Sequence, residues 1–234
     1  MGAIVLLPVY RPGRRLLTLI TDLLADGRDP TGVVVVDDGS GPSADRVLAA
    51  VRDLGCVVLR YPGNKGKGVA LKHGFRHVAA LHPGVDMVTA DGDGQHRAAD
   101  IRAVAQRSGR GGVVLGARRF DRMPLRSRVG NVVVDMLFQR VTGRALADTQ
   151  TGLRAYPAGL LTWLCTLPGE RFEYEMNVLL AVVGGGVRIE EVPIPTIYLD
   201  DNAASNFAGL ADSARVLRSL ARHATRPVPV VRSS

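Results

Sequence analysis

The chain has 234 residues, of which 46% are hydrophobic and 22% are charged, and its formal net charge is +8. This length and composition predict one domain with a packed core and exclude wholesale disorder, and no apolar run reaches the roughly 18–20 residues of a membrane-spanning helix. The positive charge indicates an anionic partner, which composition leaves open among nucleic acid, a membrane surface and a phosphorylated substrate.

Strand-like runs alternate with helix-like segments through the N-terminal half. The expected strands cover residues 3–9, 33–36, 57–59, 86–90 and 112–115, and the expected helices cover residues 14–25, 44–54, 68–81 and 100–106. The strand segments are continuously apolar, which is typical of strands that are covered on both faces. Their alternation with helices predicts an α/β fold in which helices flank a mostly parallel central sheet.

The C-terminal half is less regular. Its expected helices cover residues 126–142, 172–183 and 207–221, and its expected strands cover residues 152–156 and 187–193. Pro227 and Pro229 predict a loose tail over residues 226–234, because proline cannot continue a helix. We therefore expect residues 1–225 to form a single domain.

The last expected helix bears on where the protein acts. Arg215, Arg218 and Arg222 share one of its faces, and a basic amphipathic helix is typical of binding at a membrane surface. The alternative is an ordinary surface helix whose apolar side packs on the domain. No signal peptide is evident, and Cys56 and Cys165 are too far apart in sequence to indicate a disulfide framework. We therefore expect a cytoplasmic protein, and the basic face of the last helix leaves open a weak peripheral attachment to the cytoplasmic face of the membrane.

Polar clusters follow the five N-terminal strands, each at the same end of its strand. They cover residues 8–10, 37–40, 61–68, 91–95 and 116–119. Ligands of parallel sheets bind beyond the carboxyl ends of the strands, so we expect these clusters to meet in one active cleft.

The cluster Asp91-Gly92-Asp93-Gly94-Gln95 has the chemistry of a metal site. Two carboxylates separated by one small residue can converge on a hard divalent cation, and the glycines allow the backbone to bend so that both point inward. Oxygen ligands select Mg²⁺ or Mn²⁺, and Gln95 can add a neutral oxygen. The alternative is a plain Asp-Gly turn at the end of a strand.

Two further clusters have the chemistry of a nucleotide site. Asp37 and Asp38 can accept hydrogen bonds from a base or a ribose. The alternative is an ordinary turn between strand and helix, in which an aspartate or Ser40 caps the following helix. Lys65 and Lys67 alternate with glycines just before a helix, which is typical of a phosphate-binding turn. A solvated basic turn would have the same composition.

Arginines are dense in the segment after the fifth strand. They are Arg118, Arg119, Arg122, Arg126 and Arg128. Because a guanidinium group binds phosphate through two parallel donors, the segment predicts a second anionic ligand. The alternative is a charged surface that contacts only solvent.

The order of these motifs resembles that of the inverting family 2 glycosyltransferases with the GT-A fold, close to the dolichol- and polyprenol-phosphate sugar synthases. The matching segments are residues 7–10, 36–40, 64–68, 91–96, 116–118, 148–154 and 171–175. Two positions depart from the usual pattern. Arg11-Pro12 stands where Asn-Glu is common, and residues 200–206 stand where many mannosyl-lipid synthases carry a basic loop.

The resemblance implies a GDP- or UDP-linked sugar as donor, a polyprenyl or dolichyl phosphate as acceptor, and Mg²⁺ or Mn²⁺ as cofactor. The nucleotide would be held by Pro8, Tyr10, Asp37, Asp38, Lys65, Lys67 and Asp91. The metal would be held by Asp91, Asp93 and Gln95, and the acceptor phosphate by Arg118, Arg126 and Arg128. The resemblance implies catalytic roles for Asp93 and Asp148.

The residues leave other functions open. With a hydroxyl acceptor, a carboxylate must remove a proton, and Asp148 is the first candidate, ahead of Glu173 and Glu175. A sugar-1-phosphate nucleotidyltransferase is disfavoured because no glycine-rich loop follows the first strand. A basic nucleic-acid-binding module is disfavoured because aromatic residues make up only 5% of the chain and no recognised motif is present, so we expect no nucleic-acid partner.

Overall fold

The computed structural model describes residues 2–25, 27–118, 125–197 and 210–224. Its strands are β1 (Ile4–Val9), β2 (Val33–Asp37), β3 (Val57–Arg60), β4 (Met87–Thr89), β5 (Val113–Arg118), β6 (Arg154–Tyr156) and β7 (Ile189–Ile194). Its helices are α1 (Arg14–Leu24), α2 (Asp45–Asp53), α3 (Lys67–Leu81), α4 (Ala98–Ala105), α5 (Leu125–Thr142), α6 (Leu161–Leu164), α7 (Glu173–Gly184) and α8 (Leu210–Ala224). All the predicted elements are present with shifted ends, and the short helix α6 is an addition.

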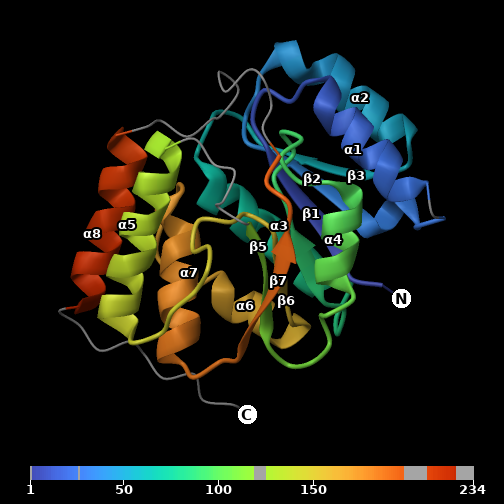
Figure 1. Ribbon diagram of the computed structural model, residues 1–234. Coiled ribbons are helices and arrows are strands. Elements are labelled where there is room, and N and C mark those ends of the chain that lie inside the picture. The colour runs from blue at the N-terminus through green and yellow to red at the C-terminus, as the bar shows by residue number, and fades with distance from the viewer. Residues whose placement is uncertain (1, 26, 119–124, 198–209, 225–234) are drawn as a thin grey trace.

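The strands form one sheet with helices on both faces (Figure 1). The strand order is β3-β2-β1-β4-β6-β5-β7. Only β6 among the described strands is antiparallel to its neighbours, β4 and β5. The predicted α/β fold with a mostly parallel sheet is therefore confirmed.

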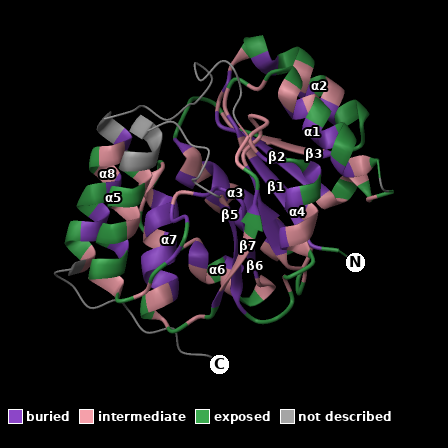
Figure 2. Ribbon diagram, in the orientation of Figure 1, coloured by how far each residue is buried: buried purple, intermediate pink, exposed green. Residues whose placement is uncertain are grey.

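The sheet separates two core layers. Ile4 and Leu6 of β1 pack toward α3, α6 and α7, whereas Val5 and Leu7 pack toward α1, α2 and α4. Successive side chains of a strand point to opposite faces, so a strand that is covered on both faces must be apolar throughout. Burying one such side chain stabilises the fold by about 1.5–3 kcal/mol. Figure 2 shows the buried residues along the sheet and on the inner sides of the helices.

The antiparallel strand β6 places the loop before it at the functional edge of the sheet. Since β6 runs opposite to β4 and β5, its beginning lies at their carboxyl ends. Gly116 of β5 donates a hydrogen bond to the Leu153 carbonyl at 2.8 Å, and a Cβ at position 116 would lie 2.8 Å from the Leu153 side chain. The segment 116–118 was expected beyond the strand, but it belongs to β5, and Arg118 is the last residue of that strand.

Helix α8 packs against α5 and α7. Val216 and Leu220 are buried in this contact, whereas Arg218 and Arg222 are exposed. None of the helices in the described ranges combines the length and the apolar character needed to cross a bilayer. The expected tail over residues 226–234 lies outside the described residues.

Candidate active site

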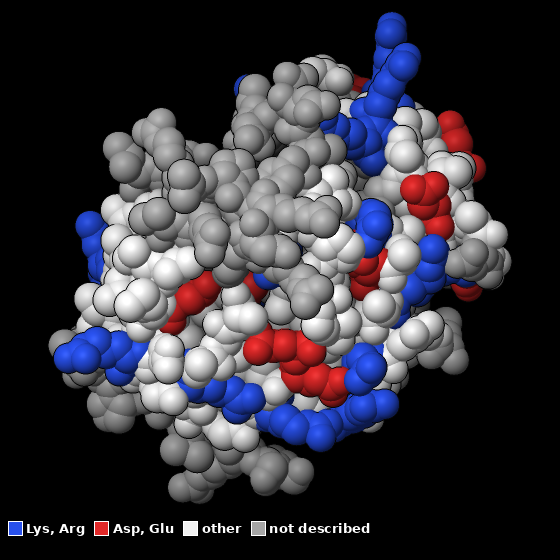
Figure 3. Space-filling model, in the orientation of Figure 1, with Lys and Arg blue, Asp and Glu red and all other residues white. Residues whose placement is uncertain are grey.

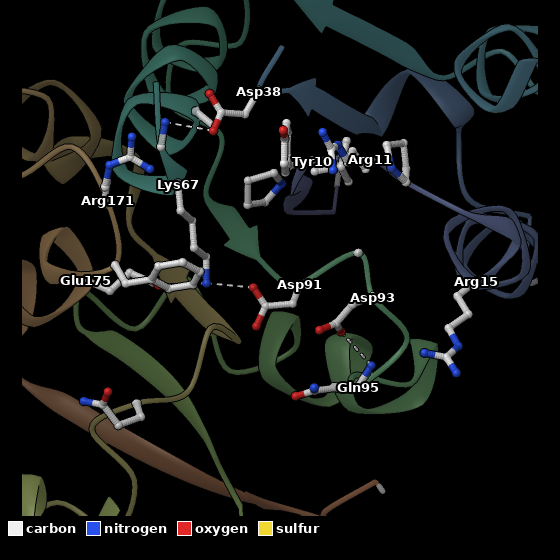
Figure 4. Close-up of a pocket in the computed structure, with 18 of the residues that line it drawn as sticks. Tyr10, Arg11, Arg15, Asp38, Lys67, Asp91, Asp93, Gln95, Arg171 and Glu175 are labelled. Carbon is white, nitrogen blue, oxygen red and sulfur yellow. Dashed lines mark hydrogen bonds and ion pairs between the residues drawn. The ribbon is translucent and has the colours of Figure 1, made fainter. Parts of the chain in front are cut away.

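A cavity of about 1230 Å³ opens at the carboxyl edge of the sheet (Figure 4). All five predicted clusters contribute to its wall, so their convergence on one cleft is confirmed. The predicted site residues that line it are Pro8, Tyr10, Asp38, Lys67, Asp91, Asp93, Gln95 and Arg118. Small-molecule pockets usually measure about 300–1,000 Å³, so this cavity suits an extended ligand or two ligands side by side.

Lys67 lies between two carboxylates of the cavity wall. Its ammonium nitrogen is 2.7 Å from Asp91 Oδ1 and 2.7 Å from Glu175 Oε2. Figure 4 shows Lys67 extending toward Asp91, with Glu175 on the other side. Burial disfavours the ammonium charge, but the two carboxylates outweigh burial and raise the pKa of Lys67. The expected phosphate-binding lysine is therefore already engaged by two acidic residues from distant segments.

The acidic turn after β4 brings Asp91, Asp93 and Gln95 into the cavity. The Gln95 N–H donates to Asp93 Oδ1 at 2.9 Å. Burial and the charge of Asp91 raise the pKa of Asp93, whereas Lys67 and His96 overcome burial and hold the pKa of Asp91 well below its usual range. The Asp91 charge disfavours ionisation of Asp93, and a divalent cation bound between these hard oxygen donors would relieve the repulsion.

The described residues contain no ready-made cluster of three His, Cys, Asp or Glu side chains for a metal ion. A cation at the acidic turn would therefore depend on the amide oxygen of Gln95, or on oxygens of a bound ligand, to complete its coordination.

Two contacts that the motifs did not predict fix the Asp91 carboxylate. A Cβ at Gly152 would lie 2.4 Å from Asp91 Oδ2, so only glycine leaves room there. His96 is 3% exposed, and its Nε2 lies 3.5 Å from the same oxygen. Both residues fall inside segments that resemble the family pattern. His96 belongs to the same turn as Asp91, whereas Gly152 belongs to the loop before β6, and residue spacing does not reveal a contact between two separate loops.

Asp38 organises the loop that leads into α3. Its carboxylate accepts hydrogen bonds from the Tyr61 hydroxyl at 2.8 Å, from the Lys65 N–H at 2.7 Å and from the Gly66 N–H at 2.8 Å. Gly66 has a φ of +108°, and a Cβ there would lie 2.5 Å from the Glu170 carbonyl oxygen, so the turn requires glycine. Asp38 therefore fixes the position at which α3 begins.

Two predicted nucleotide-binding residues lie outside the cavity wall. Asp37 is fully buried, accepts hydrogen bonds from Ser40 and forms an ion pair with Arg60 at 2.9 Å. The Lys65 side chain is exposed, and its ammonium lies 5.4 Å from the centre of the Tyr61 ring. Asp37 thus stabilises the turn after β2 through its contacts with Ser40 and Arg60. The exposed Lys65 side chain does not line the cavity.

Arg118 lines the cavity, and Asp148 holds it in place. The fully buried Asp148 carboxylate accepts hydrogen bonds from Arg118 Nε at 2.6 Å and from Nη2 at 3.1 Å. Burial disfavours the guanidinium charge, but Asp148 outweighs burial and raises the pKa of Arg118. Asp148 itself lies outside the cavity wall. The side chains of Arg126 and Arg128 lie outside the described residues.

The loop before β6 is anchored from two sides. Asp135 of α5 accepts hydrogen bonds from the Thr149 N–H at 3.0 Å and from its hydroxyl at 2.6 Å, and burial raises the pKa of Asp135 to about 6. The fully buried Arg154 donates to the carbonyls of Thr149, Thr151 and Glu175 at 2.7–3.1 Å. Arg154 thereby joins this loop to the first turn of α7.

The loop after β1 adds positive charge that the motifs did not predict. Arg11, Arg14 and Arg15 all line the cavity. Arg11 has a left-handed φ of 51°, its N–H donates to the Ser40 hydroxyl at 2.7 Å, and its guanidinium lies 5.1 Å from the centre of the Tyr10 ring. The departure from the family pattern at this loop therefore lies in the cavity wall, which favours anionic ligands.

The chain matches the model of the family "Glycosyl transferase family 2" over residues 4–153, more than half of its length. A UDP-N-acetylglucosamine–dolichyl-phosphate N-acetylglucosaminyltransferase of Methanococcus voltae is 28% identical over an alignment of 222 residues, and the match covers 85% of this chain and 87% of that enzyme. An undecaprenyl-phosphate 4-deoxy-4-formamido-L-arabinose transferase of Serratia proteamaculans is 30% identical over an alignment of 159 residues, and the match covers 65% of this chain and 48% of that enzyme.

A crystal structure of glucosyl-3-phosphoglycerate synthase from Mycobacterium tuberculosis, in complex with Mn²⁺, UDP and glucosyl-3-phosphoglycerate, has the same fold. The two structures match with a TM-score of 0.69 at 21% sequence identity, over 97% of this chain and 81% of that one. The fold is therefore the GT-A fold of nucleotide-sugar glycosyltransferases. The match to the family model over residues 4–153 shows that the chain is a glycosyltransferase and belongs to glycosyltransferase family 2.

Proposed function

We propose that this enzyme transfers a sugar from a GDP- or UDP-linked donor to a polyprenyl or dolichyl phosphate, with inversion at the anomeric carbon. One observation carries the proposal: the acidic turn at 91–95 and the guanidinium of Arg118 line the same cavity, whose volume of about 1230 Å³ admits a donor beside an acceptor phosphate. The names of the Methanococcus and Serratia relatives, which specify dolichyl and undecaprenyl phosphate acceptors, support the choice of a lipid phosphate.

The donor side of the cavity is built from β1, β2 and β4. Pro8, Tyr10 and Asp38 would border the nucleoside, and the acidic turn would lie at the diphosphate. A Mg²⁺ or Mn²⁺ ion held by Asp91, Asp93 and Gln95 would neutralise negative charge on the diphosphate. The arginines of the first loop add positive charge on the same side.

In the proposed step, an acceptor oxygen forms a bond to the anomeric carbon from the face opposite the diphosphate. The bond between that carbon and the diphosphate oxygen breaks, and the nucleoside diphosphate leaves with the electron pair. A phosphate oxygen is already anionic near neutral pH, so no general base is required, and Arg118 positions the phosphate for attack.

Asp148 separates the two acceptor classes experimentally. If Asp148 only holds Arg118, Asp148→Asn should change kcat modestly and leave the pH profile unaltered. In that case Arg118→Ala should raise the KM for the lipid phosphate by about 10- to 100-fold, because the phosphate loses a hydrogen bond to a charged group. If Asp148 removes a proton from a hydroxyl acceptor, Asp148→Asn should instead lower kcat by about 10²–10⁴-fold and abolish the acid limb of the profile. Steady-state kinetics with both substrates varied distinguishes these results. The buried ion pair with Arg118 favours the first one.

We infer further that the outer face of α5 and α8 docks on a membrane. Apolar side chains of this face are exposed despite their size: Val132, Val133, Met136, Leu137 and Leu217. Arg140 of α5 and Arg218 and Arg222 of α8 are exposed on the same two helices. Exposed apolar and arginine side chains on one pair of helices suit the boundary between lipid tails and anionic headgroups. This surface differs from the arginine face of α8 alone, because the most exposed apolar side chain, Met136, belongs to α5.

The double variant Met136→Glu/Leu137→Glu should bind vesicles that contain anionic phospholipid about tenfold more weakly than the wild type, because two apolar contacts are replaced by repelled carboxylates. Sedimentation with vesicles measures this binding, which should also weaken as salt is added. Leu81→Glu is the matched control, because Leu81 is 63% exposed on α3. An equal loss in the control, or no vesicle binding by the wild type, would rule out this docking face.

The face of the molecule in Figure 3 does not show the charge pattern that is usual at a nucleic-acid site. Figure 3 shows lysine and arginine side chains in separate groups on the visible face, with acidic side chains between them. A continuous basic strip is the usual footprint of a nucleic-acid site.

The proposed function is tested by thermal-shift measurements with UDP- and GDP-sugars, each with Mg²⁺, Mn²⁺ or a chelator, followed by turnover with polyprenyl phosphate. One nucleotide class should raise the Tm in the presence of the cation, since a ligand that binds only the folded state stabilises it. A protein that binds no nucleotide sugar under any of these conditions contradicts the proposal.

A further inference from the structure

We propose that Glu175 is a specificity-determining residue that accepts a hydrogen bond from a hydroxyl group of the donor sugar. The inference rests on the proposed function and adds a substrate contact to it. Glu175 is 7% exposed and lines the cavity from the first turn of α7. One carboxylate oxygen, Oε2, is fixed by the Lys67 ammonium at 2.7 Å.

The second oxygen of the Glu175 carboxylate, Oε1, is buried and has no hydrogen-bond partner among the described residues. A buried carboxylate oxygen without a partner is unfavourable, so such an atom on a residue that lines the cavity points to a ligand that donates to it on binding. Glu175 is also rigidly placed, because its own carbonyl accepts a hydrogen bond from the buried Arg154 at 2.7 Å.

The chemistry of the surroundings selects the sugar as the donor of this bond. The phosphate groups of either substrate are anionic acceptors, and a carboxylate repels them. Asp91 lies on the other side of the Lys67 ammonium, also at 2.7 Å, so Glu175 is one side chain away from the turn assigned to the diphosphate. Two neutral groups with O–H donors adjoin the diphosphate, the ribose and the transferred sugar. The contact is assigned to the sugar, and binding of UDP or GDP without sugar, which keeps the ribose, tests this assignment.

Single-hydroxyl deletions in the donor test the contact directly. The wild type should bind one monodeoxy nucleotide sugar about 10- to 100-fold more weakly than the parent sugar, as expected for a lost hydrogen bond to a charged acceptor. Glu175→Gln turns an acceptor into a donor at this position, so it should lose most of that discrimination while binding UDP or GDP without sugar as the wild type does. Calorimetric titration of the protein with each nucleotide and each deoxy analogue measures both quantities.

Two control variants separate the sugar contact from other effects. Glu190→Gln removes the same charge from a carboxylate outside the cavity, paired with Arg107 at 2.8 Å, and should leave the deoxy-sugar pattern intact. Glu175→Asp keeps the charge but shortens the side chain, and should also lose discrimination, so the test does not depend on the stability of one variant.

Each remaining result overturns the inference. Equal weakening of nucleotide and nucleotide-sugar binding in Glu175→Gln means that Glu175 only holds Lys67. An unchanged deoxy-sugar pattern in both Glu175 variants means that Oε1 makes no sugar contact. If the wild type binds nucleotides but no nucleotide sugar, or binds neither, the proposed function itself fails and the inference fails with it.

Discussion

Replacing Asp93 with asparagine should lower the rate of sugar transfer by about 10²–10³-fold without lowering the Tm. A rate loss of this size is typical when one preorganised electrostatic contact to a reacting group is removed. Burial and the charge of Asp91 raise the pKa of Asp93. A carboxyl group whose pKa is raised on folding contributes stability below its ordinary pKa, and that contribution is lost as the pH rises through the folded value. At neutral pH the ionised Asp93 therefore destabilises the ligand-free fold, and asparagine removes this cost.

The measurement pairs a transfer assay with thermal unfolding in the presence of a chelator. Asp53→Asn is the matched control, because Asp53 is an exposed residue on α2, and it should change neither quantity. Addition of Mg²⁺ or Mn²⁺ with nucleotide should raise the Tm of the wild type and of the control but not that of Asp93→Asn. Full transfer activity in Asp93→Asn would remove Asp93 from the proposed metal site.

The fold could be predicted from the sequence because its strands leave a strong local signal. The run Val33–Val36 is typical of a strand covered on both faces, and the alternation of such runs with helices predicts a mostly parallel sheet. The position of β6 was not predictable in this way. Its three residues, Arg154–Tyr156, are buried like those of β4, and the direction of a strand in a sheet depends on where the chain returns rather than on local pattern.

The candidate site could be predicted as a set of loops but not as a set of contacts. Asp38 and Lys67 reach the cavity because they stand at strand and helix ends, a property that the order of motifs contains. The partner of each charged group comes from elsewhere in the chain. Asp148 is paired with Arg118, and Glu175 with Lys67, because β6 and α7 return to the carboxyl edge. Spacing along the chain contains no information on these pairs, so the sequence identifies candidate residues more reliably than it identifies their partners.

Lys67→Met should lower the free energy of unfolding by about 3–5 kcal/mol, the cost of breaking a buried ion pair by removing one partner. Methionine fills a similar volume, so the main loss is electrostatic: the carboxylates of Asp91 and Glu175 would lie together in the cavity wall without the ammonium that is 2.7 Å from each. Urea unfolding measures the change. Lys65→Met is the matched control two residues away, and it should have little effect because the Lys65 side chain is exposed.

The pH dependence identifies the cause of this loss. In the wild type the pKa of Asp91 is lowered and that of Lys67 is raised. The Asp91 contribution is therefore present above the ordinary aspartate pKa and is lost in acid, whereas the Lys67 contribution is present below the ordinary lysine pKa and is lost in strong base. Without Lys67, burial and repulsion by the Glu175 carboxylate should raise the pKa of Asp91 above its ordinary value, so the folded variant should bind more protons than the unfolded chain. Mild acidification should then reduce the difference in the free energy of unfolding between Lys67→Met and the wild type. At neutral pH, the double variant Lys67→Met/Glu175→Gln should regain part of the stability that Lys67→Met loses. A difference that is constant with pH, or a double variant less stable than Lys67→Met, would mean that Lys67 stabilises the cavity by packing and not by charge.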